Sequence, residues 1–405
     1  MSGMRPLGDL VSLKEALRII DEVSKPTQRR EKVPIWHASG RILAEDLRAG
    51  IDVPPFTRSA MDGFAVRADD VRSARMDGPV ILQVMEKIFA GGTPGKKILK
   101  GQCAEIATGG MLPKGADAVV MVEDTSGKAR GRIAINSSVA KGDNVIEAGE
   151  DIRRGALIAR NMDLLTPAKI GAIAAVGNEA VSCYCRPSVV VMPTGDEVVR
   201  PGEKLRPGQV YDVNTFTLKS AIQSFGGVVD VREIVGDSKK SIMNAISREG
   251  GADIIIFSGG SSVGEKDLIV DAVSELGEVL FHGVAIRPGK PTLLGKSGIA
   301  LVLGMPGHPT SCLSNAYIFL EPMIMKIGRY PQKKKVQSRL RLSSDVNLAA
   351  GRTTVLPVRV DGGKAVPVFR ESSAITSMTN ADGYVLVGPE TKSLKKGASV
   401  SVVLF

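Results

Sequence analysis

The segment "ADIIIFSGGSSVGEKD", residues 252 to 267, decides the fold class of this chain. It begins with a short apolar run, continues through a stretch rich in glycine and serine, and leads into the helical pattern "LIVDAVSELG". A short apolar run bounded by turn residues is typical of a buried strand. The segment therefore predicts a strand, a loop and a helix in that order.

Three further strand and helix pairs surround this segment. Before it, "SVVVMPTGDEVV" leads into "NTFTLKSAIQSFGG", and "VVDVREIVGDS" leads into "KKSIMNAISREGG". After it, "IALVLGMPGHP" leads into a long helix expected from about residue 310 to residue 326. Strands that alternate with helices in this way predict a multidomain α/β protein with a central doubly wound parallel sheet.

The regions on either side of the α/β pattern have a different character. Ser12 and Glu15 form a capping box for a helix that Pro26 closes, and Thr166 with Pro167 predicts a second, short helix start. Between them, residues 33 to 151 are rich in glycine and short strand patterns, so this block is expected to be β-rich and inserted in a discontinuous N-terminal unit. From about residue 329 to 405, strand patterns such as "TTVLPVRV" and "GYVLVGP" predict a small β domain.

Composition excludes several classes of protein. The chain has 405 residues and a net charge of +10, but its basic clusters are short and scattered and only 4% of residues are aromatic, which argues against a nucleic-acid surface. No apolar run approaches the length of a membrane span. The four cysteines are too few for a disulfide scaffold, and Cys183 with Cys185 has no second ligand pair for zinc. The chain is therefore expected to be cytoplasmic, without a nucleic-acid or membrane partner.

Polar loops follow the predicted parallel strands at their carboxyl ends, where α/β sheets bind ligands. These loops carry Asp196 and Glu197, then Asp237, then residues 258–267, then residues 306–311. The backbone N–H groups of residues 258–267 suit an anion, and Glu265 and Asp267 beside them could hold Mg²⁺. The alternative is that the glycines form a plain turn and that Asp267 belongs to the first turn of the helix.

Two proline-containing loops add candidate anion ligands. "AIRPGKPT" presents Arg287 and Lys290 in a loop held by Pro288, Gly289 and Pro291, and a preordered pair of cations suits a tetrahedral oxyanion. "MPGHPTS" places Pro306, Pro309 and Ser311 before a helix. The alternative for the first loop is an ordinary hairpin with solvated bases, and His308 in the second is interpreted as a loop or cap residue rather than a base.

The β-rich block contains three further candidates. "TRSAMDGFAV" contains Asp62, "IATGGMLPKGADAVVMVED" contains Thr108 and "GEDIRRG" contains Asp151. An Asp-Gly pair is a strong hairpin signal, so the plain interpretation of Asp62 is a turn residue. The residues alone do not select any of the three as functional.

Taken together, these segments resemble the molybdopterin molybdenumtransferase family, also called molybdenum insertases, to which the E domain of gephyrin is related. The likeness rests on "PPFTRSAMDGFAV", "IATGGMLPKGADAVVMVED", "GEDIRRG", "PTGDEV", "SGGSSVGEKD", "RPGKP" and "MPGHPTSC", in the family's order. It implies four domains: residues 1–53 with 152–186, residues 54–151, a molybdopterin-binding α/β domain over 187–328, and a C-terminal β-barrel over 329–405.

The resemblance also implies a reaction and its site. The family takes adenylylated molybdopterin with molybdate, in some members tungstate, and releases AMP and molybdenum cofactor. The implied active site lies between the subunits of a homodimer, and molybdopterin adenylyltransferase or molybdoenzymes are implied as further partners. Carried over by motif, the implied catalytic residues are Asp62, Thr108, Asp151, Glu197, Asp237 and Asp267; Asp237, Glu265 and Asp267 would bind Mg²⁺; and Ser262, Gly264, Arg287, Lys290, Pro306, Pro309, Ser311, Arg352 and Ser373 would bind the substrates.

The sequence departs from the family pattern at two of these loops. Arg287 stands where many members have lysine, and His308 where many have asparagine. Arginine keeps the charge but changes the hydrogen-bonding geometry, which bears on the choice of oxyanion. Two alternatives remain at this stage: the related molybdopterin adenylyltransferase, which has "GGTG" and "RD" where this chain has "GGSSVGEKD", and a noncatalytic molybdopterin-binding scaffold, which would be expected to lack the site carboxylates.

Overall fold

The computed structural model describes residues 10–259, 268–331, 337–369 and 371–405. The chain divides into two compact units. The first unit comprises Met1–Glu31, Gly40–Ile42 and Cys183–Phe405, and the second comprises Lys32–Ser39 and Leu43–Ser182. Within the described residues, no helix is long and apolar enough to cross a membrane.

The centre of the first unit is a six-stranded sheet. Its order is β16 (Val228–Val231), β13 (Ser188–Pro193), β17 (Ile254–Ser258), β21 (Ala300–Met305), β20 (Leu293–Ser297) and β18 (Glu278–His282). The first four strands are parallel, which confirms the predicted fold class. The strand β20 pairs antiparallel with β21, and β18 pairs antiparallel with β20, which forms an edge that the alternating pattern did not predict.

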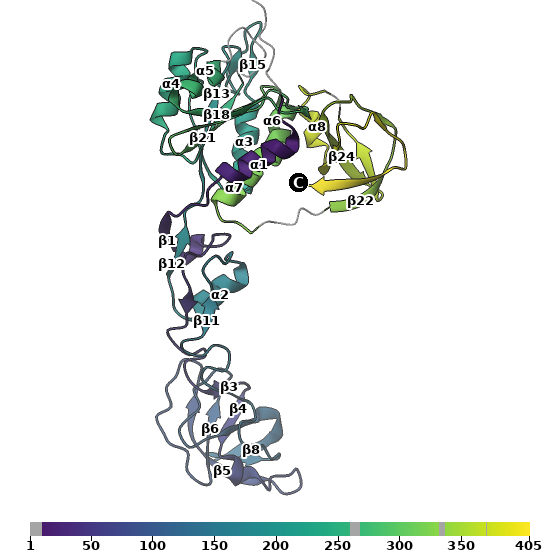
Figure 1. Cartoon of the computed structure of the whole chain (residues 1–405). Helices are drawn as coiled ribbons and strands as arrows, with labels where there is room; N and C mark the ends of the chain where they lie inside the picture. The colour runs from purple at the N-terminus through teal and green to yellow at the C-terminus, as the bar shows by residue number, and fades with distance from the viewer. Residues whose placement is uncertain (1–9, 260–267, 332–336, 370) are drawn as a thin grey trace, which may run out of the picture. The chain divides into compact units, whose positions relative to one another are not determined.

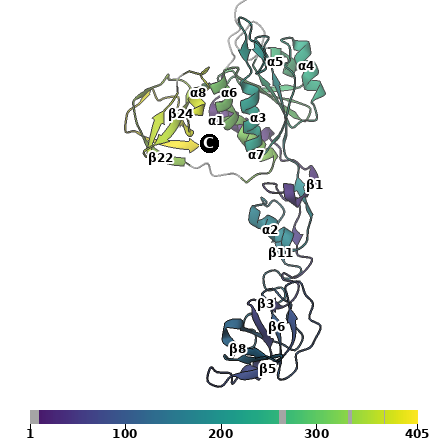
Figure 2. The same cartoon turned by 180° about the vertical axis from the view of Figure 1, so that it is seen from behind.

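Helices cover both faces of this sheet (Figures 1 and 2). On one face pack α1 (Leu13–Val23), α3 (Asn214–Ser224) and the continuous α6 (Pro309–Asn315), η4 (Ala316–Leu320) and α7 (Glu321–Ile327). On the other face pack α4 (Lys239–Arg248) and α5 (Leu268–Leu276). The strand β17 is buried on both sides: Ile254 and Ile256 join the first core, whereas Ile255 and Phe257 join the second. Burial of each such side chain stabilises the fold by about 1.5–3 kcal/mol, which explains why β17 reads as a continuous apolar run.

The C-terminal part of the first unit is a closed barrel, as the family resemblance implied. Its strands β24 (Thr353–Asp361), β25 (Lys364–Pro367), β22 (Gln337–Leu342), β28 (Ser399–Leu404) and β26 (Gly383–Val387) pair in that order, and β24 also pairs with β26. The short strand β19 (Ile286–Arg287) adds to β24 from the α/β region. The remaining elements of the first unit are β14 (Val198–Val199), β15 (Val210–Tyr211), β23 (Val346–Asn347), β27 (Ser393–Leu394) and α8 (Thr376–Thr379).

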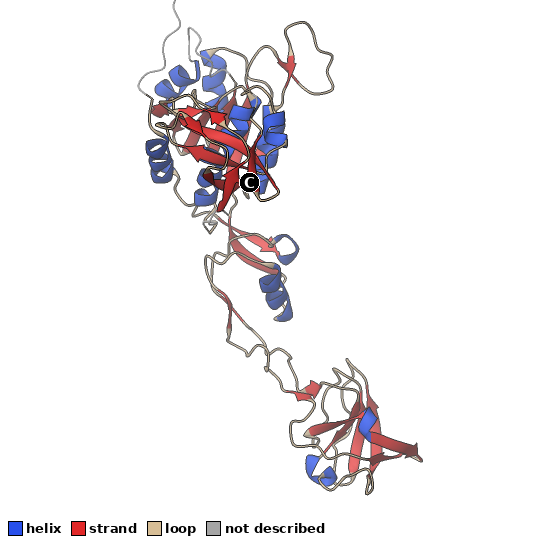
Figure 3. Cartoon of the chain, turned by 90° about the vertical axis from the view of Figure 1, so that its right-hand side faces the viewer, coloured by secondary structure: helices blue, strands red, loops and turns tan. Residues whose placement is uncertain are grey.

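The second unit is β-rich, with a sheet in the order β7 (Ala118–Met121), β4 (Gly63–Val66), β6 (Gln102–Ile106), β5 (Val80–Ile88), β9 (Arg132–Ile135) and β8 (Thr125–Ala129) (Figure 3). Two-stranded sheets pair β3 (Arg58–Ser59) with β10 (Val145–Ile146), and β2 (Leu47–Arg48) with β11 (Leu157–Ala159). A further two-stranded sheet pairs β1 (Arg30–Pro34) with β12 (Ala180–Tyr184). The helices are α2 (Pro167–Ala175) and the short turns η1 (Ile35–His37), η2 (Ala68–Val71) and η3 (Val122–Asp124).

Both predicted helix starts are confirmed. The Ser12 hydroxyl accepts the Glu15 N–H at 3.1 Å, and the Thr166 hydroxyl accepts the Lys169 N–H at 3.4 Å. The predicted division of the chain into four domains with the boundaries given above stays a prediction.

Candidate functional site

The loops that follow three parallel strands meet at the carboxyl edge of the α/β sheet. The Thr194 N–H donates to the Ser258 carbonyl at 3.1 Å, and the Gly259 N–H donates to the Met305 carbonyl at 3.3 Å. Gly259 has a φ of +113°, and a β-carbon built on it would lie only 2.4 Å from the Thr194 carbonyl oxygen. Glycine is thus required where the β13 and β17 loops touch.

Buried polar atoms without a partner gather behind this junction. The hydroxyls of Thr194 and Ser258 are buried and have no hydrogen-bond partner among the described residues. The same holds for the side-chain oxygens of Asn214 and Thr215 at the start of α3. A buried polar group left unpaired costs about 1–3 kcal/mol, so such atoms favour a ligand that would pair with them. The sequence analysis did not select these four residues, although the polar "DVNT" run before α3 was a visible signal.

Three carboxylates lie close together beyond β13 and β16. Partial burial raises the pKa of Asp237, and the negative charges of Asp196 and Glu197 raise it further. The Glu197 carboxylate folds back over Gly195, where an added β-carbon would lie 2.8 Å from one of its oxygens. The Val235 N–H donates to the Pro193 carbonyl at 2.9 Å, which joins the β16 loop to the end of β13. The structure therefore brings the predicted residues Glu197 and Asp237 together.

Four of the predicted ligands cannot be placed, because Ser262, Gly264, Glu265 and Asp267 lie outside the described residues. Among the residues that the structure describes, no group of three or more His, Cys, Asp or Glu side chains is arranged to hold a metal ion.

The loop Arg287–Thr292, called here the cationic loop, is anchored by a buried asparagine. Asn315 of α6 donates to the Thr292 hydroxyl at 2.6 Å and to the Gly289 carbonyl at 3.3 Å. Gly289 has a φ of +108°, and a β-carbon there would collide with the Asn315 side chain. Arg287 is exposed at the end of β19, and Lys290 is half-buried. The loop connects the antiparallel strands β18 and β20, and the Gly283 N–H donates to the Thr292 carbonyl at 2.9 Å, so the hairpin of the alternative interpretation is present. Within it, β19 also pairs with β24 of the barrel.

The loop between β21 and α6 contacts the C-terminal barrel. His308 occupies the N-cap position of α6, and its Nδ1 lies 2.9 Å from the Ser372 hydroxyl. The Thr310 N–H donates to the Ser372 carbonyl at 3.1 Å. This contact brings Ser373, which is exposed, beside α6, and pairing of Thr353 with Ile286 brings Arg352 beside the cationic loop. Of the other predicted residues here, Pro306 is buried, Pro309 is the first residue of α6 and Ser311 is only 3% exposed.

In the second unit, the structure joins Asp62 and Thr108. The Thr108 N–H and hydroxyl both donate to one Asp62 carboxylate oxygen, at 2.7 and 3.0 Å. These bonds lower the pKa of Asp62, which keeps its exposed carboxylate charged. Asp151 is also exposed, and its backbone N–H donates to the Val53 carbonyl at 3.1 Å.

The interpretation of Asp62-Gly63 as a hairpin turn is wrong. The strand before it, β3, pairs with β10, whereas the strand after it, β4, pairs with β6 and β7. Gly63 is needed for a different reason, since a β-carbon there would lie 1.9 Å from the Val120 carbonyl oxygen. The glycine allows β4 to pair closely with β7, and Asp62 immediately precedes β4, where Thr108 can reach it.

These features define a class: a multidomain α/β protein with a ligand site at the carboxyl edge of a doubly wound sheet, joined to a β-barrel and a β-rich unit. The sequence matches the MoeA N-terminal region (domain I and II) over residues 11–177, the probable molybdopterin binding domain over 190–326, and the MoeA C-terminal region (domain IV) over 339–405.

Individual relatives agree with these matches. A molybdopterin molybdenumtransferase from Haemophilus influenzae is 35% identical over 319 residues, which covers 78% of this chain and 78% of the relative. One from Bacillus subtilis is 28% identical and covers 97% of this chain and 94% of the relative. The crystal structure of a molybdopterin biosynthesis moeA protein from Pyrococcus horikosii aligns with a TM-score of 0.84 at 38% identity, over 98% of this chain and 99% of that one. The chain belongs to the molybdopterin molybdenumtransferase family.

Proposed function

We propose that this chain is a molybdopterin molybdenumtransferase that acts on adenylylated molybdopterin and molybdate and releases AMP and molybdenum cofactor. The observation that carries the proposal is that a MoeA N-terminal region, a probable molybdopterin binding domain and a MoeA C-terminal region match in order over residues 11–177, 190–326 and 339–405. The site geometry supports it, since anion-binding and carboxylate groups are both present at the edge of the α/β sheet. Tungstate could replace molybdate as the oxyanion.

The cationic loop would bring together two anions that repel each other. Arg287 can donate two parallel hydrogen bonds to one oxyanion, and Lys290 adds a second positive charge within the same loop. Because Asn315 donates hydrogen bonds to Gly289 and Thr292 and so holds the cationic loop in one conformation, the loop would lose little conformational entropy when it binds an oxyanion. Pro306, Pro309, Ser311, Arg352 and Ser373 would complete the contacts to phosphate or molybdate.

The carboxylates would supply the opposite charge pattern. Asp237 with Glu265 and Asp267 would hold Mg²⁺, since carboxylate oxygens are the ligands this ion prefers. Burial and the nearby charges of Asp196 and Glu197 raise the pKa of Asp237, and a cation would favour its charged form. The ion would neutralise pyrophosphate charge. Glu197 would orient a water toward the pyrophosphate phosphorus, and the bond to the departing AMP would break. Ser262 and Gly264 would bind the phosphates through the loop that contains them.

The second unit would complete the site from another subunit of a homodimer. Asp62 is held charged and in one orientation by Thr108, although it lies in a unit that lacks the cationic loop. We propose that Asp62, Thr108 and Asp151 of one subunit face the α/β crevice of the other. Molybdopterin adenylyltransferase or molybdoenzymes would deliver the substrate or accept the product, and the reaction would take place in the cytoplasm.

The reaction can be tested directly. Purified protein is incubated with adenylylated molybdopterin, Mg²⁺ and either molybdate or tungstate, and AMP is followed by chromatography. We expect AMP and active cofactor to form together, and to require an oxyanion. Absence of AMP with both oxyanions would refute the proposed reaction.

The role of Asp62 is tested by Asp62→Asn, with Asp69→Asn as the matched control. Both carboxylates are exposed in the second unit, and the change is the same. We expect Asp62→Asn to reduce turnover by at least about tenfold with unchanged melting temperature and oligomeric state, and Asp69→Asn to leave turnover unchanged. Equal turnover in the two variants would remove Asp62 from the mechanism.

A further inference from the structure

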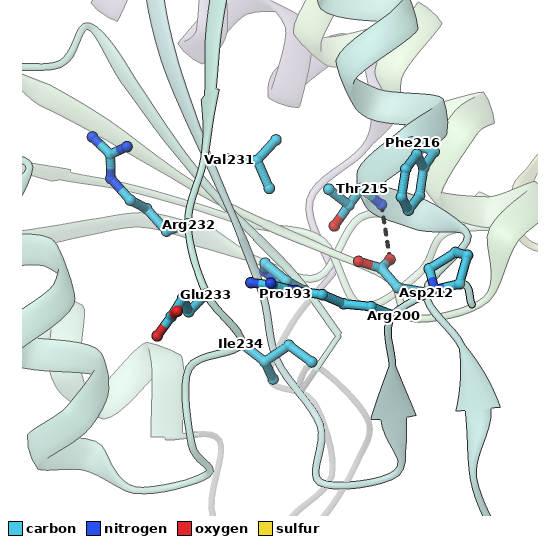
Figure 4. A pocket seen from close by; sticks show the side chains of 10 residues that line it. Pro193, Arg200, Asp212, Thr215, Phe216, Val231, Arg232, Glu233 and Ile234 are labelled. Carbon is cyan, nitrogen blue, oxygen red and sulfur yellow. Dashed lines mark hydrogen bonds between the residues drawn. The ribbon is translucent and has the colours of Figure 1, made fainter. Parts of the chain in front are cut away.

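A pocket of about 260 Å³ opens beside the start of α3, between the ends of β13 and β16 (Figure 4). One side is formed by Asp212, Thr215 and Phe216, and the other by the segment from Val231 to Ile234. Arg200 reaches across the pocket toward Pro193. None of these lining residues is among the predicted site residues, so the pocket has no role in the reaction as described above.

The polar groups of this pocket have unused hydrogen-bonding capacity. Asp212 is 8% exposed, and one of its carboxylate oxygens accepts the Thr215 N–H at 3.0 Å. Among the described residues its other oxygen has no hydrogen-bond donor, so a carboxylate with several lone pairs retains capacity to accept. Thr215 is 5% exposed, and its hydroxyl oxygen, turned toward the pocket, has no partner among the described residues. A nearly buried carboxylate beside an unpaired hydroxyl indicates a ligand with N–H groups.

The cations at the rim differ in their availability. The Arg232 guanidinium forms two hydrogen bonds with Glu249, at 2.6 and 3.0 Å, and is therefore engaged. Arg200 is exposed, and no ion pair within the described part of the chain involves it. The half-exposed ring of Phe216 and the apolar side chains of Val231 and Ile234 provide walls for a flat ring.

We propose that this pocket binds the 2-amino-4-oxo-pyrimidine edge of the substrate's pterin base. That edge presents two adjacent N–H donors, N3–H and the 2-amino group, which match a carboxylate such as Asp212, followed by a carbonyl oxygen that matches Arg200. The inference rests on the proposed function, because it deepens the recognition of the same substrate. Adenine, the other base of that substrate, fits less well, since its corresponding edge offers one donor group and one ring-nitrogen acceptor and has no carbonyl.

The match predicts a change of specificity on a single isosteric substitution. Lumazine differs from pterin in having a carbonyl at position 2, which would place an acceptor against the Asp212 carboxylate. In Asp212→Asn, an amide nitrogen can donate to that carbonyl while the amide oxygen accepts N3–H. The side-chain oxygen of asparagine can still accept the Thr215 N–H, so α3 is expected to remain intact.

The experiment measures binding of pterin-6-carboxylate and lumazine-6-carboxylate to the full chain by ligand-observed NMR titration. We expect the wild type to prefer the pterin by at least about tenfold, and Asp212→Asn to lose or reverse that preference. Arg200→Gln should weaken both probes equally, because the 4-oxo group is common to them. Asp230→Asn makes the same chemical change on neighbouring β16, outside the pocket, and should keep the wild-type preference.

Two outcomes would overturn the inference: no saturable pterin binding by the wild type, or an unchanged pterin preference in folded Asp212→Asn. Thermal melting identifies a variant that has not folded. If Asp212→Asn does not fold, Arg200→Gln provides the test, because Arg200 is exposed and its replacement should still weaken pterin binding. The AMP assay is independent. If the wild type releases AMP but Asp212→Asn keeps its preference, only the pocket assignment fails; if the wild type releases no AMP, the proposed function fails.

Discussion

Gly259→Ala should separate the loops that form the candidate site. Gly259 follows β17 at a φ of +113°, and a β-carbon there would lie 2.4 Å from the Thr194 carbonyl oxygen and 3.1 Å from the Thr194 hydroxyl. The nearest obstacle is backbone, which a rotamer change cannot relieve. Alanine at position 259 must therefore push the loops after β13 and β17 apart or change the backbone conformation of residue 259.

The size of the effect follows from two terms. Holding a side-chain-bearing residue in a backbone region reserved for glycine costs about 1–3 kcal/mol. Overpacking against a fixed neighbour costs about 1–3 kcal/mol more. Together they predict destabilisation of about 4 kcal/mol, which in a domain of this size corresponds to a fall in melting temperature of roughly 8–16 °C.

Gly307→Ala provides the matched control. Gly307 lies in the neighbouring β21 loop, but a β-carbon there would meet only the Gly259 Cα, at 3.6 Å, which is an ordinary contact. Calorimetry should show a small change for Gly307→Ala and a large one for Gly259→Ala. AMP release, measured well below both melting temperatures, should fall only for Gly259→Ala. Equal melting temperatures for the two variants would refute the close contact between the loops.

Three further predictions concern charge and hydrogen bonding. Thr108→Val removes one hydrogen-bond donor to Asp62 and should raise the pKa of that carboxyl toward its ordinary value, which NMR titration of the carboxyl carbon measures. In the wild type, the stabilisation from the ionised carboxylate is present above the ordinary pKa and is lost as pH falls through the lowered pKa. Glu197→Gln removes one negative charge and should lower the raised pKa of Asp237. The stabilisation from the protonated form of Asp237 is lost as pH rises through its raised pKa. An unchanged Asp237 pKa in the same NMR titration of the variant would contradict this prediction. Asn315→Ala leaves its two acceptors in the cationic loop without their donor, so it should cost about 1–3 kcal/mol in thermal unfolding and weaken molybdate binding by calorimetry, and full molybdate affinity would refute the anchoring role.

Local signals explain why much of the fold could be predicted. The helix starts at Ser12 and Thr166 depend on hydrogen bonds to residues three positions away, which a sequence displays directly. The parallel strands β13, β17 and β21 were predicted because they are almost entirely buried, whereas the largely exposed β16 was predicted from its place before a helical pattern. The edge formed by β18 and β20 was missed although both of its pairings are local, with only Gly298 and Ile299 between β20 and β21, because the sequence analysis followed the alternation of strands with helices. Closure of the barrel by β24 and β26 joins more distant residues, and only the family resemblance supplied it.

The site was predictable in a different way. The carboxylates and cations could be selected because they follow strands or lie between prolines. The contact between Asp62 and Thr108 joins residues 46 positions apart, so no local pattern contains it. The unpaired hydroxyls of Thr194 and Ser258 could not be recognised at all, because a serine or threonine becomes unusual only after its burial and its neighbours are known.

The charge arrangement at the sheet edge gives a reason for the order of binding. Burial raises the pKa of Asp237, and the negative charges of Asp196 and Glu197 raise it further, so this cluster disfavours an anion until a cation arrives. The cationic loop has no such barrier and can accept an oxyanion first. The substrate's pyrophosphate would then enter with Mg²⁺ as a partly neutralised species. The affinity for molybdate should accordingly be independent of Mg²⁺, whereas the affinity for adenylylated molybdopterin should rise when Mg²⁺ is present. Calorimetric titrations with and without Mg²⁺ measure both affinities. A requirement of molybdate binding for Mg²⁺ would refute this order.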